Sequence, residues 1–200
     1  MQRADHDLAF MLQYENIAWY EDGKVKILDR RIYPARVEFV TCGTHQEVAQ
    51  AITDMVTQSA GPYTAVPMGM ALAAHECRDK TAAEQMEYLR KAAHTISHAR
   101  PTTVKRMALL CDLCLAEAER ALAAGEDTAQ AIVNKTVELN NTRYERVAKI
   151  GKYLVDLFPE NGTVMTHCFA ETIVGMMLRE CSERGKHIRL FCPETRPYFQ

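Results

Sequence analysis

The sequence lacks the features of a secreted or membrane-spanning protein. Its first residues, MQRADHDLAF, are charged and contain no apolar stretch before a small-residue cleavage site, so we expect no signal peptide there. The longest apolar run, MGMALAA, is far shorter than the roughly 20 residues that cross a bilayer. From these absences we expect a protein of the cytoplasm, with no membrane as a partner.

A strong charge of one sign is also missing. The chain has 24 Lys and Arg residues against 26 Asp and Glu residues, a net charge of −2, so it has no basic field to attract nucleic acid. Its seven cysteines are an odd number, and without a secretory signal they favour reduced thiols over a disulfide framework. The 200 residues, of which 48% are hydrophobic and 25% charged, are typical of a globular protein with one or two domains.

The N-terminal part predicts a small β-structure. Two apolar-rich runs flank the turn sequence EDGK at 21–24, which is a hairpin signal, and RVEFV at 36–40 adds a third strand. Thr44, followed three residues later by Glu47, then predicts a capping box at the start of a helix. The stretch QSAGPYTAVP at 58–67 interrupts the helical pattern, and we expect a loop there.

Three longer helices are predicted downstream. The first carries an apolar stripe from Met86 to Ile96 and breaks at Pro101. The second runs roughly over 102–122 and stops at Gly125, and the third covers about 128–158.

The C-terminal segment has a different pattern: a strand at TVMTH, an amphipathic helix at ETIVGMMLRECSERG and a second strand at HIRLFC. This order predicts a βαβ unit with two parallel neighbouring strands. The fold class is therefore α/β: an N-terminal small β plus helical domain at 1–158, followed at 159–200 by the start of a Rossmann-like parallel α/β domain, which we expect to be incomplete. Ligands gather at the carboxyl ends of such strands, where Cys168 and the segment 193–196 should lie.

Cys168 has two interpretations. It is either a small buried residue that fills the strand–helix junction, or a reactive thiol. Free N–H groups at a helix N-terminus stabilise anions, so a cysteine there should have a lowered pKa. His167 is not automatically its partner, because neighbouring residues along a strand point to opposite faces. Spacing alone leaves both interpretations open.

Two arginines are candidate anion ligands. Arg100 precedes a predicted helix whose first turn carries Pro101, which suits a phosphate, although a solvated arginine at a helix end is the commoner case. Arg196 in PETRPYFQ has the same two interpretations, and Glu194 is its candidate partner.

Two further patterns are weaker signals. His94 and His98 are four residues apart on one helix face, but zinc needs at least three ligands and no third is evident. The CDLC sequence places Cys111 and Cys114 inside a helical pattern with no preceding strand, so we interpret them as core residues. We expect no metal.

Five segments together resemble methylthioribose-1-phosphate isomerases. In chain order they are WYEDGKVKILDRRIYP, QEVAQAITDMV, ARPTTVKR, GTVMTHC and ETRPYFQ. These isomerases belong to a group related to the α, β and δ subunits of translation initiation factor 2B, which also contains ribose-1,5-bisphosphate isomerases. The resemblance spans nearly all of the chain. It implies a helical N-terminal domain, a Rossmann-like C-terminal domain with the sugar phosphate between them, a homodimer and a place in methionine salvage.

The resemblance also assigns residues. Cys168 matches the catalytic cysteine, Arg100 and Gln200 match residues that contact substrate, and Arg196 lies in the matching E-T-R-P motif. Gln58, Ser59 and Ala60 occupy the place of an Arg-Gly-Ala substrate loop, so Gln58 stands where the family has an arginine and one positive charge is missing. Phe169 stands where the family often has asparagine. Both departures indicate an altered pocket.

The family's catalytic aspartate lies further along its Rossmann-like domain than residue 200. We therefore expect this chain to be a truncated form of a longer isomerase and to be inactive alone. The first functional hypothesis is an aldose–ketose isomerase for a pentose 1-phosphate, which needs neither a metal nor an organic cofactor. The alternative is a non-catalytic sensor of a sugar phosphate or nucleotide, as the initiation-factor relatives suggest.

Overall fold

The first two strands pair as the turn sequence predicts. In the computed structural model, which describes residues 3–194, β1 (Ala18–Glu21) and β2 (Lys24–Leu28) form an antiparallel hairpin. Asp22 and Gly23 at the turn both have positive φ, of 49° and 73°. Two-residue turns of this kind match the right-handed twist of the flanking strands.

A third strand completes the sheet, but it begins later than predicted. β3 (Phe39–Cys42) pairs antiparallel with β2, whereas the sequence pattern placed this strand at 36–40. Along β2, Val25 and Ile27 are buried and alternate with the exposed Lys24 and Lys26. The sheet therefore presents one apolar face, and that face packs against the helix α3.

The helix α3 (Pro62–Glu76) corrects the prediction of a loop over 58–67. Twelve of its fifteen residues are buried, because it is apolar on every side. Pro62 starts the helix at a position where a missing N–H costs nothing. Pro67 lies one turn further inside, where burial outweighs the loss of a single backbone hydrogen bond.

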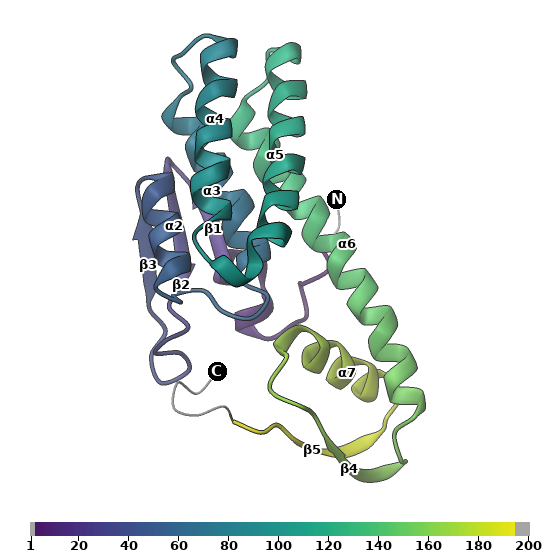
Figure 1. Cartoon of the computed structure of the whole chain (residues 1–200). Helices are drawn as coiled ribbons and strands as arrows, with labels where there is room; N and C mark the ends of the chain where they lie inside the picture. Colours follow the sequence, from purple (N-terminus) through teal and green to yellow (C-terminus); the bar gives the residue numbers. More distant parts are fainter. Residues whose placement is uncertain (1–2, 195–200) are drawn as a thin grey trace. The chain divides into compact units, whose positions relative to one another are not determined.

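The other helices of this region pack around α3. At Gly69 an added Cβ would lie 2.8 Å from Val48 of α2 and 3.1 Å from Ile96 of α4, so only glycine permits this approach. α4 and α5 lie side by side as a helical hairpin (Figure 1). The helix bounds are α1 Tyr14–Ile17, α2 His45–Thr53, α4 Ala82–Ser97, the 3-10 turn η2 Pro101–Thr103, α5 Val104–Ala124 and α6 Thr128–Asp156.

The helix boundaries follow local signals. Thr44 accepts a hydrogen bond from the Glu47 N–H at the start of α2, which is one of the two bonds of the predicted capping box. The Glu47 carboxylate accepts instead from the Gly43 N–H, one residue before the cap. Thr81 and Glu84 form a complete capping box at the start of α4. Gly125, with a φ of 68°, ends α5 in the left-handed conformation. In the part of the chain that the structure describes, no helix combines the length and the apolar character that crossing a membrane requires.

The predicted βαβ unit is confirmed. β4 (Asn161–Met165) and β5 (His187–Phe191) are parallel neighbours in direct register, and α7 (Glu171–Glu183) connects them. Gly185, with a φ of 65°, follows the helix at the predicted stop. β4 ends at Met165, two residues before the predicted end, and a connection without regular structure therefore contains Cys168.

The chain divides into two compact units. The helical unit is Tyr14–Leu139, and the βαβ unit contains the described residues 3–13 and 140–194. The helix α6 begins in the first unit and continues into the second. The domain boundary between residues 158 and 159 stays a prediction, since compactness alone does not define an independently folding domain.

Buried polar groups fix the N-terminal segment within the βαβ unit. The Tyr144 hydroxyl donates to the Leu12 carbonyl at 2.7 Å, and the Ala4 N–H donates to the Asn141 side chain at 3.0 Å. Leu12 belongs to the short 3-10 helix η1 (Phe10–Leu12). Burial raises the pKa of Tyr144 to about 12, because the phenolate would lose its hydration. The neutral phenol is therefore part of the native state.

Tyr144 should make the free energy of unfolding sensitive to alkaline pH. A phenol whose native pKa is raised stabilises the fold fully below its unfolded pKa of 10.0, and this contribution disappears as the pH rises through about 12. In Tyr144→Phe we expect a loss of about 1 kcal/mol at neutral pH from the missing hydrogen bond. The difference from the parent chain should shrink above pH 10. Chemical denaturation of both proteins from pH 8 to 12 measures it, with the exposed Tyr153→Phe as control. If the free energy of unfolding changed with pH in the same way in the parent chain and in Tyr144→Phe, this role of Tyr144 would be contradicted.

Candidate functional site

A tight turn precedes α3 and contains three of the predicted site residues. Met55 and Ser59 have positive φ, of 60° and 53°. The Gln58 side chain is buried and donates to the Met55 carbonyl at 3.2 Å, while the Gly61 N–H donates to the Gln58 carbonyl at 2.8 Å. A Cβ at Gly61 would lie 2.0 Å from the Thr57 hydroxyl oxygen, so no side chain fits there. This segment at 57–61 is held in one conformation by its own contacts.

Arg100 lies in the same unit, next to the end of α2. The Thr53 hydroxyl at the end of α2 is 2.9 Å from the Ala99 carbonyl oxygen and 3.0 Å from the Ala49 carbonyl oxygen. Arg100 has an extended backbone, and its carbonyl accepts a hydrogen bond from the Thr103 N–H at 3.1 Å. The predicted helix start at Thr102 is corrected, because Pro101–Thr103 forms the 3-10 turn η2 and α5 begins at Val104.

A second arginine in this unit, next to the turn, was missed from the sequence. Arg106 in the first turn of α5 lies over the ring of Tyr63 in the first turn of α3, with 5.4 Å between the guanidinium carbon and the ring centroid. Such an arrangement orients the guanidinium through a cation–π interaction. The sequence offered one signal, the segment GPYTA at 61–65, which contains Tyr63 and departs from the family pattern. It did not show that Arg106, on another helix, contacts Tyr63.

Cys168 lies in the βαβ unit, in the connection between β4 and α7. It is half-buried and has a φ of 70°, in the left-handed region that residues with a side chain rarely adopt. The Thr166 hydroxyl donates to the Cys168 carbonyl at 2.8 Å and so supports this conformation. The helix cap is Ala170, so the cysteine lies two residues before the cap. Strain of this kind is concentrated at functional sites.

The other cysteines provide a contrast. Cys111 and Cys114 are buried within α5, in agreement with their interpretation as core residues. Burial raises the pKa of Cys111 to about 12 and also raises the pKa of Cys114. Both thiols are therefore protonated and shielded at neutral pH. The exposed Cys192 follows β5.

The two histidine rings lie against each other at the end of α4. The His94 and His98 rings are 4.0 Å apart between centroids, and the His98 Nδ1 atom is 2.8 Å from the His94 carbonyl oxygen. Over residues 3–194, no three His, Cys, Asp or Glu side chains are grouped so that they could hold a metal ion.

The predicted site residues are divided between the two units. Gln58, Ser59, Ala60 and Arg100 all belong to the helical unit, whereas Cys168 belongs to the βαβ unit. Arg196 and Gln200 lie outside the described residues. Within the helical unit, a rigid turn and two arginines can hold an anion, and within the βαβ unit a thiol lies at the carboxyl end of a parallel strand.

Comparisons with known proteins connect the chain to one family. Residues 61–200 match the model of the initiation factor 2 subunit family. The chain is 29% identical to a methylthioribose-1-phosphate isomerase of Thermotoga maritima over 197 residues, which cover 94% of this chain and 56% of the relative. It is 30% identical to the enzyme of that name from Carboxydothermus hydrogenoformans, covering 91% of this chain and 55% of the relative.

Two solved structures share the fold. The δ subunit of translation initiation factor eIF-2B from A. fulgidus matches with a TM-score of 0.72 at 26% identity, covering 92% of this chain and 56% of that one. A 5-methylthioribose 1-phosphate isomerase from Pyrococcus horikoshii matches with a TM-score of 0.66 at 25% identity, covering 91% and 53%. The chain spans about half the length of the curated relatives it matches.

The exposure of Cys168 predicts selective alkylation. Iodoacetamide at neutral pH should label Cys168 and the exposed Cys192 in the native protein, and it should leave Cys111 and Cys114 unlabelled, because only accessible thiolates react. Peptide mass spectrometry over a time course measures each rate, and labelling in denaturant shows that all four peptides are detectable. If Cys168 reacts as slowly as Cys111, it is a packing residue.

Proposed function

The chain belongs to the initiation factor 2 subunit family, and we propose that its protein is an aldose–ketose isomerase for a pentose 1-phosphate. The substrate is 5-methylthioribose 1-phosphate or a related aldose 1-phosphate, and the product is the ketose 1-phosphate. The observation that supports this best is the half-buried Cys168 in its left-handed turn after β4, in a chain whose curated relatives are named isomerases.

The reaction sets clear requirements. The bond between the ring oxygen and C1 breaks, C1 gains a hydrogen, and C2 loses a hydrogen and becomes a carbonyl carbon. The ring oxygen gains a proton and the C2 hydroxyl loses one. A group with a tunable pKa must act at C1 and C2, and a second group must handle the ring oxygen. We assign the first role to Cys168.

The helical unit supplies the phosphate ligands in this proposal. The turn at 57–61 is held in a fixed conformation next to the start of α3, and Arg100 offers a charge-assisted hydrogen bond. A turn that is ordered before binding costs little entropy on binding. Arg196 and Gln200 are proposed as further substrate ligands on the resemblance alone.

Arg106 compensates for the uncharged Gln58. The turn carries no arginine of its own, whereas the Tyr63 ring orients the Arg106 guanidinium beside the start of α3. Arg106 thus supplies a positive charge beside the start of α3, although the turn itself carries none. We propose that this arrangement adapts the site to a pentose phosphate other than the methylthio sugar.

A second candidate is a sensor that binds a sugar phosphate without converting it. The eIF-2B δ subunit of A. fulgidus has the higher TM-score of the two structures compared, and Gln58 removes a cation from the turn. Retention of the cysteine at position 168 favours the enzyme, because binding alone does not need a thiol.

Turnover tests the enzyme directly. The protein, in the longest form that its coding sequence specifies, should convert ribose 1-phosphate or 5-methylthioribose 1-phosphate to the ketose, followed by phosphorus-31 NMR. Cys168→Ser should lose roughly 10²- to 10⁴-fold in turnover while it retains substrate affinity, as expected for a proton-transfer group. Cys192→Ser is the matched control. If the unmodified protein binds the sugar phosphate but does not convert it, the protein is a sensor and the enzyme proposal is wrong.

The role of Arg106 is tested by binding. Arg106→Gln should weaken the affinity for ribose 1-phosphate about ten- to hundredfold, the loss of one hydrogen bond to a charged group. Lys105→Gln removes the same charge from the neighbouring exposed position and should change the affinity little. Calorimetric titration of both variants and the parent protein compares them. Equal losses of affinity in Arg106→Gln and Lys105→Gln would show that binding depends on the overall positive charge of this surface and not on a specific contact from Arg106.

A further inference from the structure

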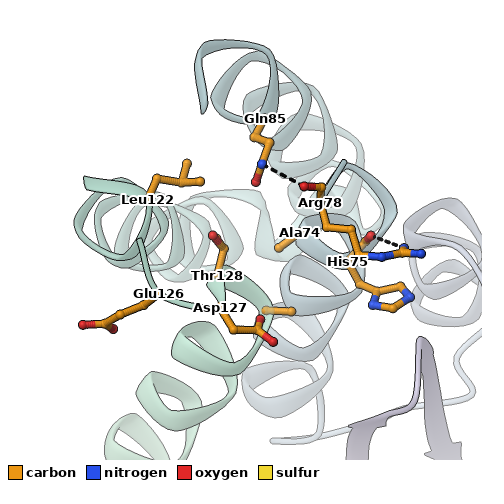
Figure 2. A pocket seen from close by; sticks show the side chains of 9 residues that line it. Ala74, His75, Arg78, Gln85, Leu122, Glu126, Asp127 and Thr128 are labelled. Atoms are coloured by element: carbon orange, nitrogen blue, oxygen red, sulfur yellow. Dashed lines mark hydrogen bonds between the residues drawn. The ribbon is translucent and has the colours of Figure 1, made fainter. Parts of the chain in front are cut away.

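Polar side chains around the hollow at the C-terminal end of α3 already have partners. Arg78 donates to the His75 carbonyl at 2.8 Å and pairs with the exposed Asp79 at 3.9 Å. The Gln85 side chain donates to the Arg78 carbonyl at 3.2 Å, as Figure 2 shows. These groups are bonded or face water, so the reactive side chains that the proposed mechanism leaves unused lie in the other unit.

Two of the seven cysteines are not buried, and both follow a strand of the βαβ unit. Cys168 comes three residues after the end of β4, and Cys192 comes directly after β5. The other five cysteines are buried, at positions 42, 77, 111, 114 and 181. Because β4 and β5 are parallel, their carboxyl ends meet at one edge of the sheet. The two accessible thiols of the chain therefore share that edge.

Thr166 is the common neighbour of both cysteines. Met165 pairs with Phe191 at the end of the ladder, and the Thr166 N–H donates to the Phe191 carbonyl at 3.0 Å. The pairing thus continues for one more residue and places Cys192 opposite Thr166. The Thr166 hydroxyl also donates to the Cys168 carbonyl at 2.8 Å. One residue therefore holds the backbone of Cys168 on one side and has Cys192 next to it on the other.

Both cysteines also lie on the same side of the sheet. Ile188 and Leu190 of β5 pack with residues of α7, so their side chains are on the side that α7 covers. Cys192 continues this alternation, which gives its side chain the same direction. The connection that contains Cys168 leaves β4 and leads to Glu171, the first residue of α7, on that side. The two thiols thus share one edge and one face.

The local spacing suits a disulfide. Disulfides join residues whose Cα atoms are about 4.4–6.8 Å apart. Neighbouring strands are separated by about 4.8 Å, which is within this range. The connection that carries Cys168 has no regular structure, so it can adjust toward Cys192 without breaking β4 or α7.

From this placement we propose that Cys168 and Cys192 are an oxidation site, at which hydrogen peroxide produces a reversible disulfide. Peroxide first oxidises one thiol to a sulfenic acid: a sulfur–oxygen bond forms, the oxygen–oxygen bond breaks and water leaves. The second thiol then attacks that sulfur, the sulfur–sulfur bond forms and a second water leaves. Two electrons pass from the two sulfurs to the peroxide, and both thiol protons leave in the water.

The disulfide removes the Cys168 thiol from the substrate and stops turnover until a dithiol reduces it. This consequence rests on the proposed isomerase function, whereas formation of the disulfide does not. Cys192 takes no part in the reaction itself, so a reduced protein without this thiol keeps its activity.

Peptide mass spectrometry after oxidation tests the pair directly. Hydrogen peroxide is added to the native protein at about 10 μM, a concentration that disfavours links between copies, and free thiols are then blocked. Trypsin separates Cys168, Cys181 and Cys192 into the peptides 153–179, 180–184 and 190–200. The link between the first and third peptides should exceed every other cysteine link at least about tenfold, because thiols held at one edge have a high effective concentration. Dithiothreitol should remove the link.

Two variants separate this pair from its surroundings. In Cys192→Ser, peroxide should leave Cys168 as a sulfenic acid, which dimedone traps, because the second thiol is missing. Cys181→Ala is the matched control: Cys181 is buried on α7, so this variant should form the link as the parent protein does. In denaturant, the preference for the link between Cys168 and Cys192 should disappear, because it depends on the fold.

Absence of the link in the native protein would overturn the proposal. So would links mainly between copies on a non-reducing gel, or equal preference for the link in native and unfolded protein. If the link forms in a protein that shows no turnover even when reduced, the disulfide is confirmed and the isomerase proposal fails. The two proposals can therefore fail separately.

Discussion

Burial of α3 on all sides is the constraint on which the helical unit depends. The sheet of β1 to β3 packs on this helix, and α2, α4 and α5 pack around it. Side chains such as Met68, Met70 and Leu72 are fully buried, and each contributes about 1.5–3 kcal/mol. Gly69 allows Val48 and Ile96 to approach the helix backbone. With its sides covered, α3 presents polar chemistry only at its two ends.

The proposed sugar-phosphate site lies at one of these ends. The turn at 57–61 and the Arg106–Tyr63 pair lie at the N-terminal end of α3. Because the core fixes this helix, the site keeps its geometry without a ligand. The βαβ unit contains the remaining candidate residue, Cys168, in a turn where its φ is positive.

Local signals in the sequence were enough to predict the elements whose boundaries are set by nearby residues. The Asp22–Gly23 turn, the caps at Thr44 and Gly125 and the βαβ unit follow from turn chemistry and periodicity. The start of α3 was missed because prolines indicate a loop unless tertiary burial outweighs them. The roles of Cys168 and Arg100 rest on the resemblance and stay predictions. Arg106 could not, because its position depends on how α5 packs against α3.

The central claim is that the turn at 57–61 and the segment from Arg100 to Arg106 form a sugar-phosphate site. Backbone amide NMR during a titration with ribose 1-phosphate tests it most directly. The account predicts saturable chemical-shift changes at residues 58–63, 99–106 and 166–170, with those at 74–78 and 126–129 unchanged. Absence of any change, or changes confined to 74–78 and 126–129, would contradict it.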